Sequence, residues 1–183
     1  PYPRGFHLIT REVLAAVTAG ALEHPAVRDE LFRARISALA GFQRLDTAAL
    51  RAKILTLEQE LAREQAGPTA RYEASCLRGR LELQSDDPAA AKASFQFAAR
   101  LLPEGVEAQV GLAQSHLMLD ELAQALSTAR TVLSKDTCNA PAGAVLLQAL
   151  AHLGRHDDVE AFVLDHPWVL DTVQGRAALG IIT

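Results

Sequence analysis

The sequence predicts an all-α protein built as an array of antiparallel helix pairs. Turn residues recur at a fixed interval, because Asp86, Asp120 and Gly154 are separated by 120 − 86 = 34 and 154 − 120 = 34 positions, a period typical of helical repeats. Each turn is followed five positions later by a small or β-branched residue: Ala91, Ala125 and Val159. Aromatic residues are only 5% of a chain that is 49% hydrophobic, which favours closely packed helices over sheets.

The N-terminal part of the chain is predicted to be an arm followed by helices that do not keep this period. Prolines and a glycine in residues 1–9 disfavour a regular helix there. Residues 10–67 are interpreted as N-terminal helices, with a degenerate repeat as the alternative. The first helix is expected from Thr10, the second from Pro25, and the third from a cap at Asp46.

The third of these helices carries a narrow apolar seam. Its residues step by four, three and four positions: Leu50, Ile54, Leu57 and Leu61. Such a seam packs either on a neighbouring helix or on a second chain. It is too short for a sustained coiled coil.

The periodic part of the chain resembles the tetratricopeptide repeat, over about residues 69–166. The matching positions are Gly79, Ala91, Phe95, Ala98 and Pro103 in the first unit, Leu112, Ala113, Leu122 and Ala125 in the second, and Leu146, Gly154 and Val159 in the third. Small residues let the two helices of a unit approach closely, and the aromatic residue fills the gap to the next unit. The resemblance implies a right-handed superhelix, which we expect residues 167–183, including Trp168, to close with a capping helix.

The same resemblance implies a concave groove lined by the first helices of successive units. The positions that face it give the predicted partner-binding residues: Glu73, Arg80, Leu83, Gln84, Glu107, Val110, Gln114, Leu117, Met118, Gln148 and His152. Arg80 has no acidic residue three or four positions away on its own helix, which leaves it hydrated or free for a partner. The Lys and Asn clamp of chaperone-binding family members is absent, since the matching pairs are Cys76/Arg80, Val110/Gln114 and Ala144/Gln148.

Charge limits the kind of partner. Residues 67–183 carry nine basic and fourteen acidic side chains, a balance of 9 − 14 = −5 within a net charge of −4 for the whole chain. Nucleic acid is therefore not expected as a partner, and a basic protein segment is favoured instead. We expect no membrane span, because no apolar stretch is long enough.

Catalytic, cofactor-binding and metal-binding residues are not predicted. The six histidines form no HxxH or HExxH motif, and Cys76 and Cys138 lack CxxC spacing. His152 and His156 lie on either side of a predicted turn, which breaks the geometry of a metal site. Phosphate-binding glycine loops and a GxSxG nucleophile elbow are also missing.

The sequence thus predicts a non-catalytic module for protein–protein interaction, acting as an adaptor, assembly factor or chaperone. One alternative is a self-associating structural subunit that uses the seam or the N-terminal arm. A weaker alternative is an accessory subunit of an enzyme. We expect a cytoplasmic location, with a leader before Pro1 left open.

Overall fold

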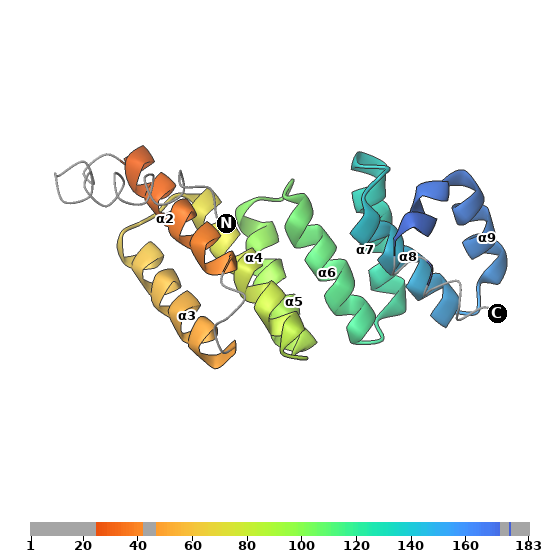
Figure 1. Cartoon of the computed structure of the whole chain (residues 1–183), viewed down its shortest axis with the longest axis horizontal. Coiled ribbons are helices and arrows are strands. Elements are labelled where there is room, and N and C mark those ends of the chain that lie inside the picture. Colours follow the sequence, from red (N-terminus) through yellow and green to blue (C-terminus); the bar gives the residue numbers. More distant parts are fainter. Residues whose placement is uncertain (1–24, 42–46, 173–175, 177–183) are drawn as a thin grey trace, which may run out of the picture. The chain divides into compact units, whose positions relative to one another are not determined.

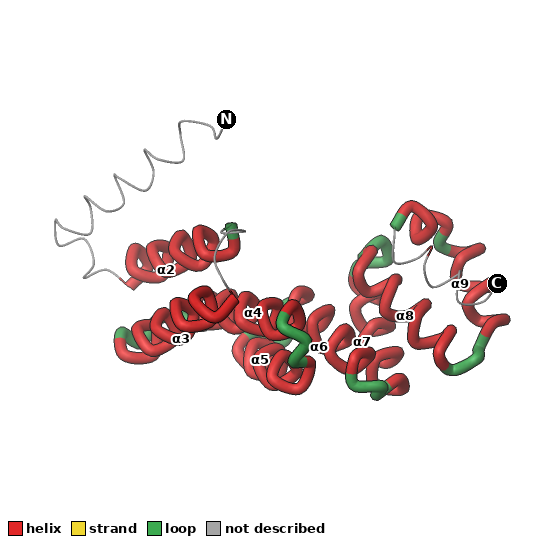
Figure 2. Tube along the Cα trace, turned by 60° about the horizontal axis from the view of Figure 1, so that its bottom comes forward, coloured by secondary structure: helices red, strands yellow, loops and turns green. Residues whose placement is uncertain are grey.

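The structure is a computed structural model that describes residues 25–41, 47–172 and 176. These residues form α-helices and short connections, with one 3₁₀ helix and no strand among them (Figures 1 and 2), so the all-α prediction is confirmed for this part of the chain. The N-terminal arm and the helix expected from Thr10 lie outside the described residues. The elements are α2 (Pro25–Ala40), α3 (Thr47–Arg63), α4 (Pro68–Gln84), α5 (Pro88–Leu101), α6 (Val106–Met118), α7 (Leu122–Lys135), α8 (Ala140–His152), α9 (His156–Asp165) and η2 (Pro167–Asp171).

The chain divides into two compact units, residues 1–77 and 78–183, with the boundary inside α4. In the first unit the seam of α3 is covered by the chain itself, since Ile54, Leu57 and Leu61 are at most 1% exposed. The connection into α4 is held by Asp29, whose Oδ1 accepts a hydrogen bond of 2.8 Å from the backbone nitrogen of Gly67.

The helices of the second unit repeat every 34 residues. Helices α5, α7 and α9 begin at positions 88, 122 and 156, and α6 and α8 begin at 106 and 140. Helices α4, α6 and α8 end at 84, 118 and 152. The observed architecture is therefore an array of helices that resembles a helical repeat and has the interval found in the sequence. No described helix is long and apolar enough to cross a membrane.

The three periodic turn residues share one backbone conformation. Asp86, Asp120 and Gly154 have φ angles of 57°, 58° and 68°, in the left-handed region that glycine, asparagine and aspartate tolerate best. After each, the next backbone nitrogen bonds to the carbonyl five residues earlier, at 2.9, 2.9 and 3.0 Å. This is the Schellman motif, which pairs carbonyl groups that a helix end otherwise leaves without partners.

Small residues bring the helices of the second unit together. Ala91, Ala125 and Val159, the residues five positions after each turn, are 0% exposed. The ring of Phe95 on α5 is 1% exposed, and a Cβ atom added at Gly79 or Gly111 would come within 2.7 and 2.4 Å of it. The aromatic ring thus fills a space that two glycines leave open.

The short 3₁₀ helix η2 packs on α8. A Cβ atom at Gly143 of α8 would lie 2.7 Å from Cη2 of Trp168, and Val169 is fully buried. The helix expected from Pro167 begins as this short 3₁₀ helix, and residues 173–175 and 177–183 lie outside the described part of the chain. Trp168 therefore packs on α8.

Candidate functional site

A hollow of about 460 Å³ lies across α4, α6 and α8 of the second unit. Its volume falls within the range of roughly 300–1,000 Å³ typical of binding pockets. The lining residues, here called the groove, are Leu83, Gln84, Gln114, Leu117, Met118, Ala140, Pro141, Ala144, Val145 and Gln148. All ten belong to the first helix of a helix pair, as the predicted groove requires.

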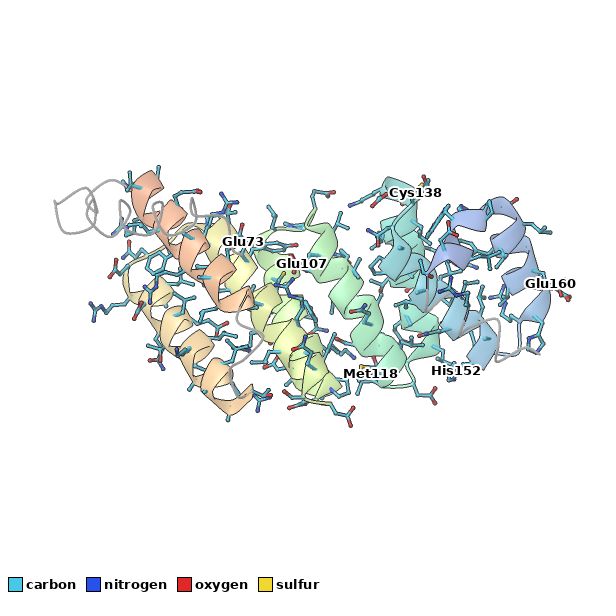
Figure 3. The ribbon with its side chains drawn as sticks, in the orientation of Figure 1. Glu73, Glu107, Met118, Cys138, His152 and Glu160 are labelled. Atoms are coloured by element: carbon cyan, nitrogen blue, oxygen red, sulfur yellow. The ribbon has the colours of Figure 1, made fainter. Side chains whose placement is uncertain are left out.

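The groove has an apolar floor that is anchored in the core. Ala144 and Val145 of α8 are 5% and 3% exposed, and Leu117 packs against the hydrophobic cluster formed around α7 and α8. Met118, which Figure 3 shows at the C-terminal end of α6, is 47% exposed. A partner that covers this thioether gains apolar burial, because methionine adapts its shape to irregular surfaces.

Three glutamines supply the polar groups of the groove. Gln114 and Gln148 occupy the same position of successive units, 148 − 114 = 34, and Gln84 lies at the end of α4. Within the described part of the chain, none of these side-chain amides makes a hydrogen bond. Each therefore keeps two donor hydrogens and one acceptor oxygen for a ligand or for water.

Six of the eleven predicted partner-binding residues line this groove: Leu83, Gln84, Gln114, Leu117, Met118 and Gln148. Val110 instead packs on the core, and His152 is exposed at the end of α8 outside the lining. Of the other four lining residues, Ala144 was named only as the clamp position beside Gln148, and Ala140, Pro141 and Val145 were not predicted. Pro141 holds the same unit position as Glu107 and could have been found by the same rule.

Two of the remaining predicted residues are paired with each other. Nη1 of Arg80 lies 3.0 Å from Oε1 of Glu107, and the two side chains are 50% and 44% exposed. The expectation that Arg80 is hydrated or free was wrong, because its carboxylate comes from α6 and not from its own helix. An exposed pair of this kind contributes about 0–1 kcal/mol, and it neutralises both charges beside the groove.

Glu73, the last predicted residue, belongs to the first unit. Its Oε1 accepts a hydrogen bond of 2.8 Å from Nε of Arg33 on α2. The pair raises the pKa of Arg33 above its ordinary value, mainly through this hydrogen bond and its charge. Glu73 is thus engaged in a hydrogen bond and ion pair between α4 and α2.

A second charged cluster, at the end of α6, is structural. Glu121 accepts hydrogen bonds of 2.6 and 2.8 Å from Lys92 on α5 and lies 2.5 Å from Nδ1 of His116 on α6. Hydrogen bonding to Lys92, and then to His116, lowers the pKa of the Glu121 carboxyl. None of these three residues lines the groove.

Among the described residues, no group of three or more His, Cys, Asp or Glu side chains could hold a metal ion. Cys76 is buried and Cys138 is exposed, and the two form no disulfide. His152 and His156 are exposed on the two sides of the α8–α9 turn.

No protein-family model matches the chain, and no curated protein matches it.

Proposed function

We propose that this protein is a non-catalytic, tetratricopeptide-like adaptor, assembly factor or chaperone that captures a segment of another protein in the groove of α4, α6 and α8. The observation that carries the proposal is that the first helices of successive units, α4, α6 and α8, all contribute side chains to a single hollow. Its lining combines half-exposed Met118 with three glutamine amides that have no partner in the described chain. Convergent apolar and polar groups in a concave site are the usual composition of a binding surface.

Within this proposal, residues 69–166 are three tetratricopeptide-like units that form a right-handed superhelix. The support is the 34-residue interval of helix starts, left-handed turns and buried small residues in the second unit. A cytoplasmic location belongs to the same proposal.

Self-association through the α3 seam gains no support, since three of its four residues are buried within the chain. Light scattering separates the two functions. A concentration-independent species near the chain mass of 19.7 kDa agrees with an adaptor and argues against a structural subunit.

The test of groove capture compares two exposed apolar residues. Partners recovered by affinity capture and identified by mass spectrometry are purified and titrated against Met118→Glu and Leu153→Glu. The two residues are 47% and 44% exposed, but only Met118 lines the groove. Because a covered carboxylate without a partner is costly, we expect Met118→Glu to weaken binding about tenfold or more.

Leu153→Glu is the matched control and should bind as the unchanged chain does. Circular dichroism should show both variants fully helical, because neither side chain is buried. Equal affinity of Met118→Glu and the unchanged protein for every purified partner would remove the groove from the proposed function.

Arg80→Glu is a poor probe of the same groove. It would place a second carboxylate beside Glu107, 3.0 Å from where the guanidinium now lies, and like charges at that distance repel. A loss of binding in that variant would mix local repulsion with the loss of a partner contact.

A further inference from the structure

We infer that the segment taken by the groove is extended, apolar and free of charged side chains, and that the glutamine amides hold its main chain. This inference rests on the proposed function, because it names the chemistry of the partner segment. It departs from the basic partner that the net charge of the second half favours.

The absence of charge in the groove is the first step. None of its ten lining residues is ionisable. Arg80, a charged residue that the sequence placed in the groove, is paired with Glu107. A lysine or a carboxylate entering the groove would therefore lose water without gaining a counter-charge from the lining. That transfer is unfavourable, and the groove therefore selects against charged segments of either sign.

The glutamines decide between an extended and a helical segment. A helix satisfies its own backbone groups, so it would cover Gln84, Gln114 and Gln148 and leave their amides without partners. An extended segment carries unpaired N–H and C=O groups that match the acceptor and donors of each amide. Since Gln114 and Gln148 are one repeat apart, they present the same pair of groups at successive steps along the segment.

The groove also sets the length of the segment. It crosses three helices, and packed helices lie about 8–10 Å apart, so the segment spans roughly 20 Å. At about 3.3 Å per extended residue, this corresponds to about six residues. Alternate side chains would face the apolar floor formed by Leu117, Ala144 and Val145.

The experiment uses the full chain and an array of immobilised hexapeptides in three sets. One set combines apolar residues with Ser, Thr, Asn and Gln, the second replaces two positions with Lys, and the third replaces them with Glu. We expect the tightest binders in the uncharged set, with charged versions of the same peptides about tenfold weaker or more. Raising NaCl from about 50 to about 500 mM should change the uncharged affinities less than about twofold, because salt screens only charge interactions.

Backbone recognition is tested on the best uncharged peptide. N-methylation removes backbone hydrogen-bond donors and can be placed on either the odd-numbered or the even-numbered residues of the peptide. We expect only one of these two methylated versions to bind more weakly, because alternate N–H groups of an extended segment point to opposite sides. Gln114→Ala with Gln148→Ala should weaken it about tenfold, since two hydrogen bonds are lost. Gln96→Ala with Gln124→Ala is the matched control, because both residues are exposed on second helices outside the groove, and it should bind normally.

Each contrary result points to a different error. Tighter, salt-sensitive binding of a charged set, abolished by Met118→Glu, would overturn the inference and leave the groove as the site. Unchanged binding after N-methylation in both registers and after removal of both glutamines would overturn main-chain recognition. Binding to none of the three sets would count against the proposed function itself.

Discussion

Replacing Gly111 with alanine tests whether the ring of Phe95 sets the distance between α5 and α6. The new Cβ atom would lie 2.4 Å from the ring, whereas carbon atoms in contact are about 3.5–4.0 Å apart. The ring would therefore have to move by about 1 Å or more. The ring has little room to move, because a Cβ atom at Gly79 would also lie within 2.7 Å of it and the ring is only 1% exposed.

Two opposing terms set the size of the effect. Overpacking a filled core costs about 1–3 kcal/mol, and exchanging glycine for alanine within a helix returns about 1 kcal/mol. We expect Gly111→Ala to lower the free energy of unfolding by about 1 kcal/mol. Urea denaturation followed by helical circular dichroism measures this as a lower midpoint with an unchanged slope.

The matched control is the same substitution in a Phe95→Leu background. Leucine lacks Cε1 and Cζ, the two ring atoms that lie nearest to Gly111, so most of the clash is removed and the helix propensity of alanine remains. In that background Gly111→Ala should raise stability by up to about 1 kcal/mol. Stabilisation by Gly111→Ala in the unchanged chain, or an equal loss in both backgrounds, would refute the packing argument.

Two further predictions concern the turns. Asp120 and Gly154 share the left-handed conformation, which glycine adopts more easily than other residues. Asp120→Gly should therefore raise the free energy of unfolding by some tenths of a kcal/mol. Gly154→Ala should lower it by about 1 kcal/mol, although no atom lies within 4 Å of the new Cβ atom. Shifts of the same sign in urea denaturation would contradict this. The lowered pKa of Glu121 means that its bonds to Lys92 and His116 stabilise the fold above the ordinary carboxyl value of 4.5 and are lost as the pH falls through the folded pKa. The stability difference between the unchanged chain and Glu121→Gln should therefore shrink below that pH in urea titrations, and a constant difference would contradict the assignment.

The periodic part of the fold could be predicted because it depends on local rules. A left-handed turn favours aspartate or glycine, and a close helix contact favours alanine, so Asp86 and Ala91 already indicate their structure in the sequence. The 34-residue register, read with the tetratricopeptide resemblance, also predicted six of the ten residues that line the groove.

Contacts between distant residues could not be predicted in this way. Arg80 meets Glu107, 27 positions later, and Gly111 faces Phe95 across a helix junction. A helical wheel shows partners three or four positions away only, so the pair of Arg80 and Glu107 has no local signal. The resemblance placed Phe95 in the gap to the next unit, but it did not identify Gly111 as the residue that the ring meets there. The net charge of residues 67–183 also gave no information about the groove, because none of the acidic residues in this part of the chain lines it.

The junction at Phe95 also fixes the order of the units. Equivalent positions in the following units hold Ala129 and Val163 in place of the ring, and Val145 in place of Gly111 (145 − 111 = 34). Removing residues 106–139 would keep every turn in phase but would bring Val145 against Phe95, where no side chain fits. The units thus share a length without being interchangeable, and a shortened or permuted array would need a new residue pair at this junction.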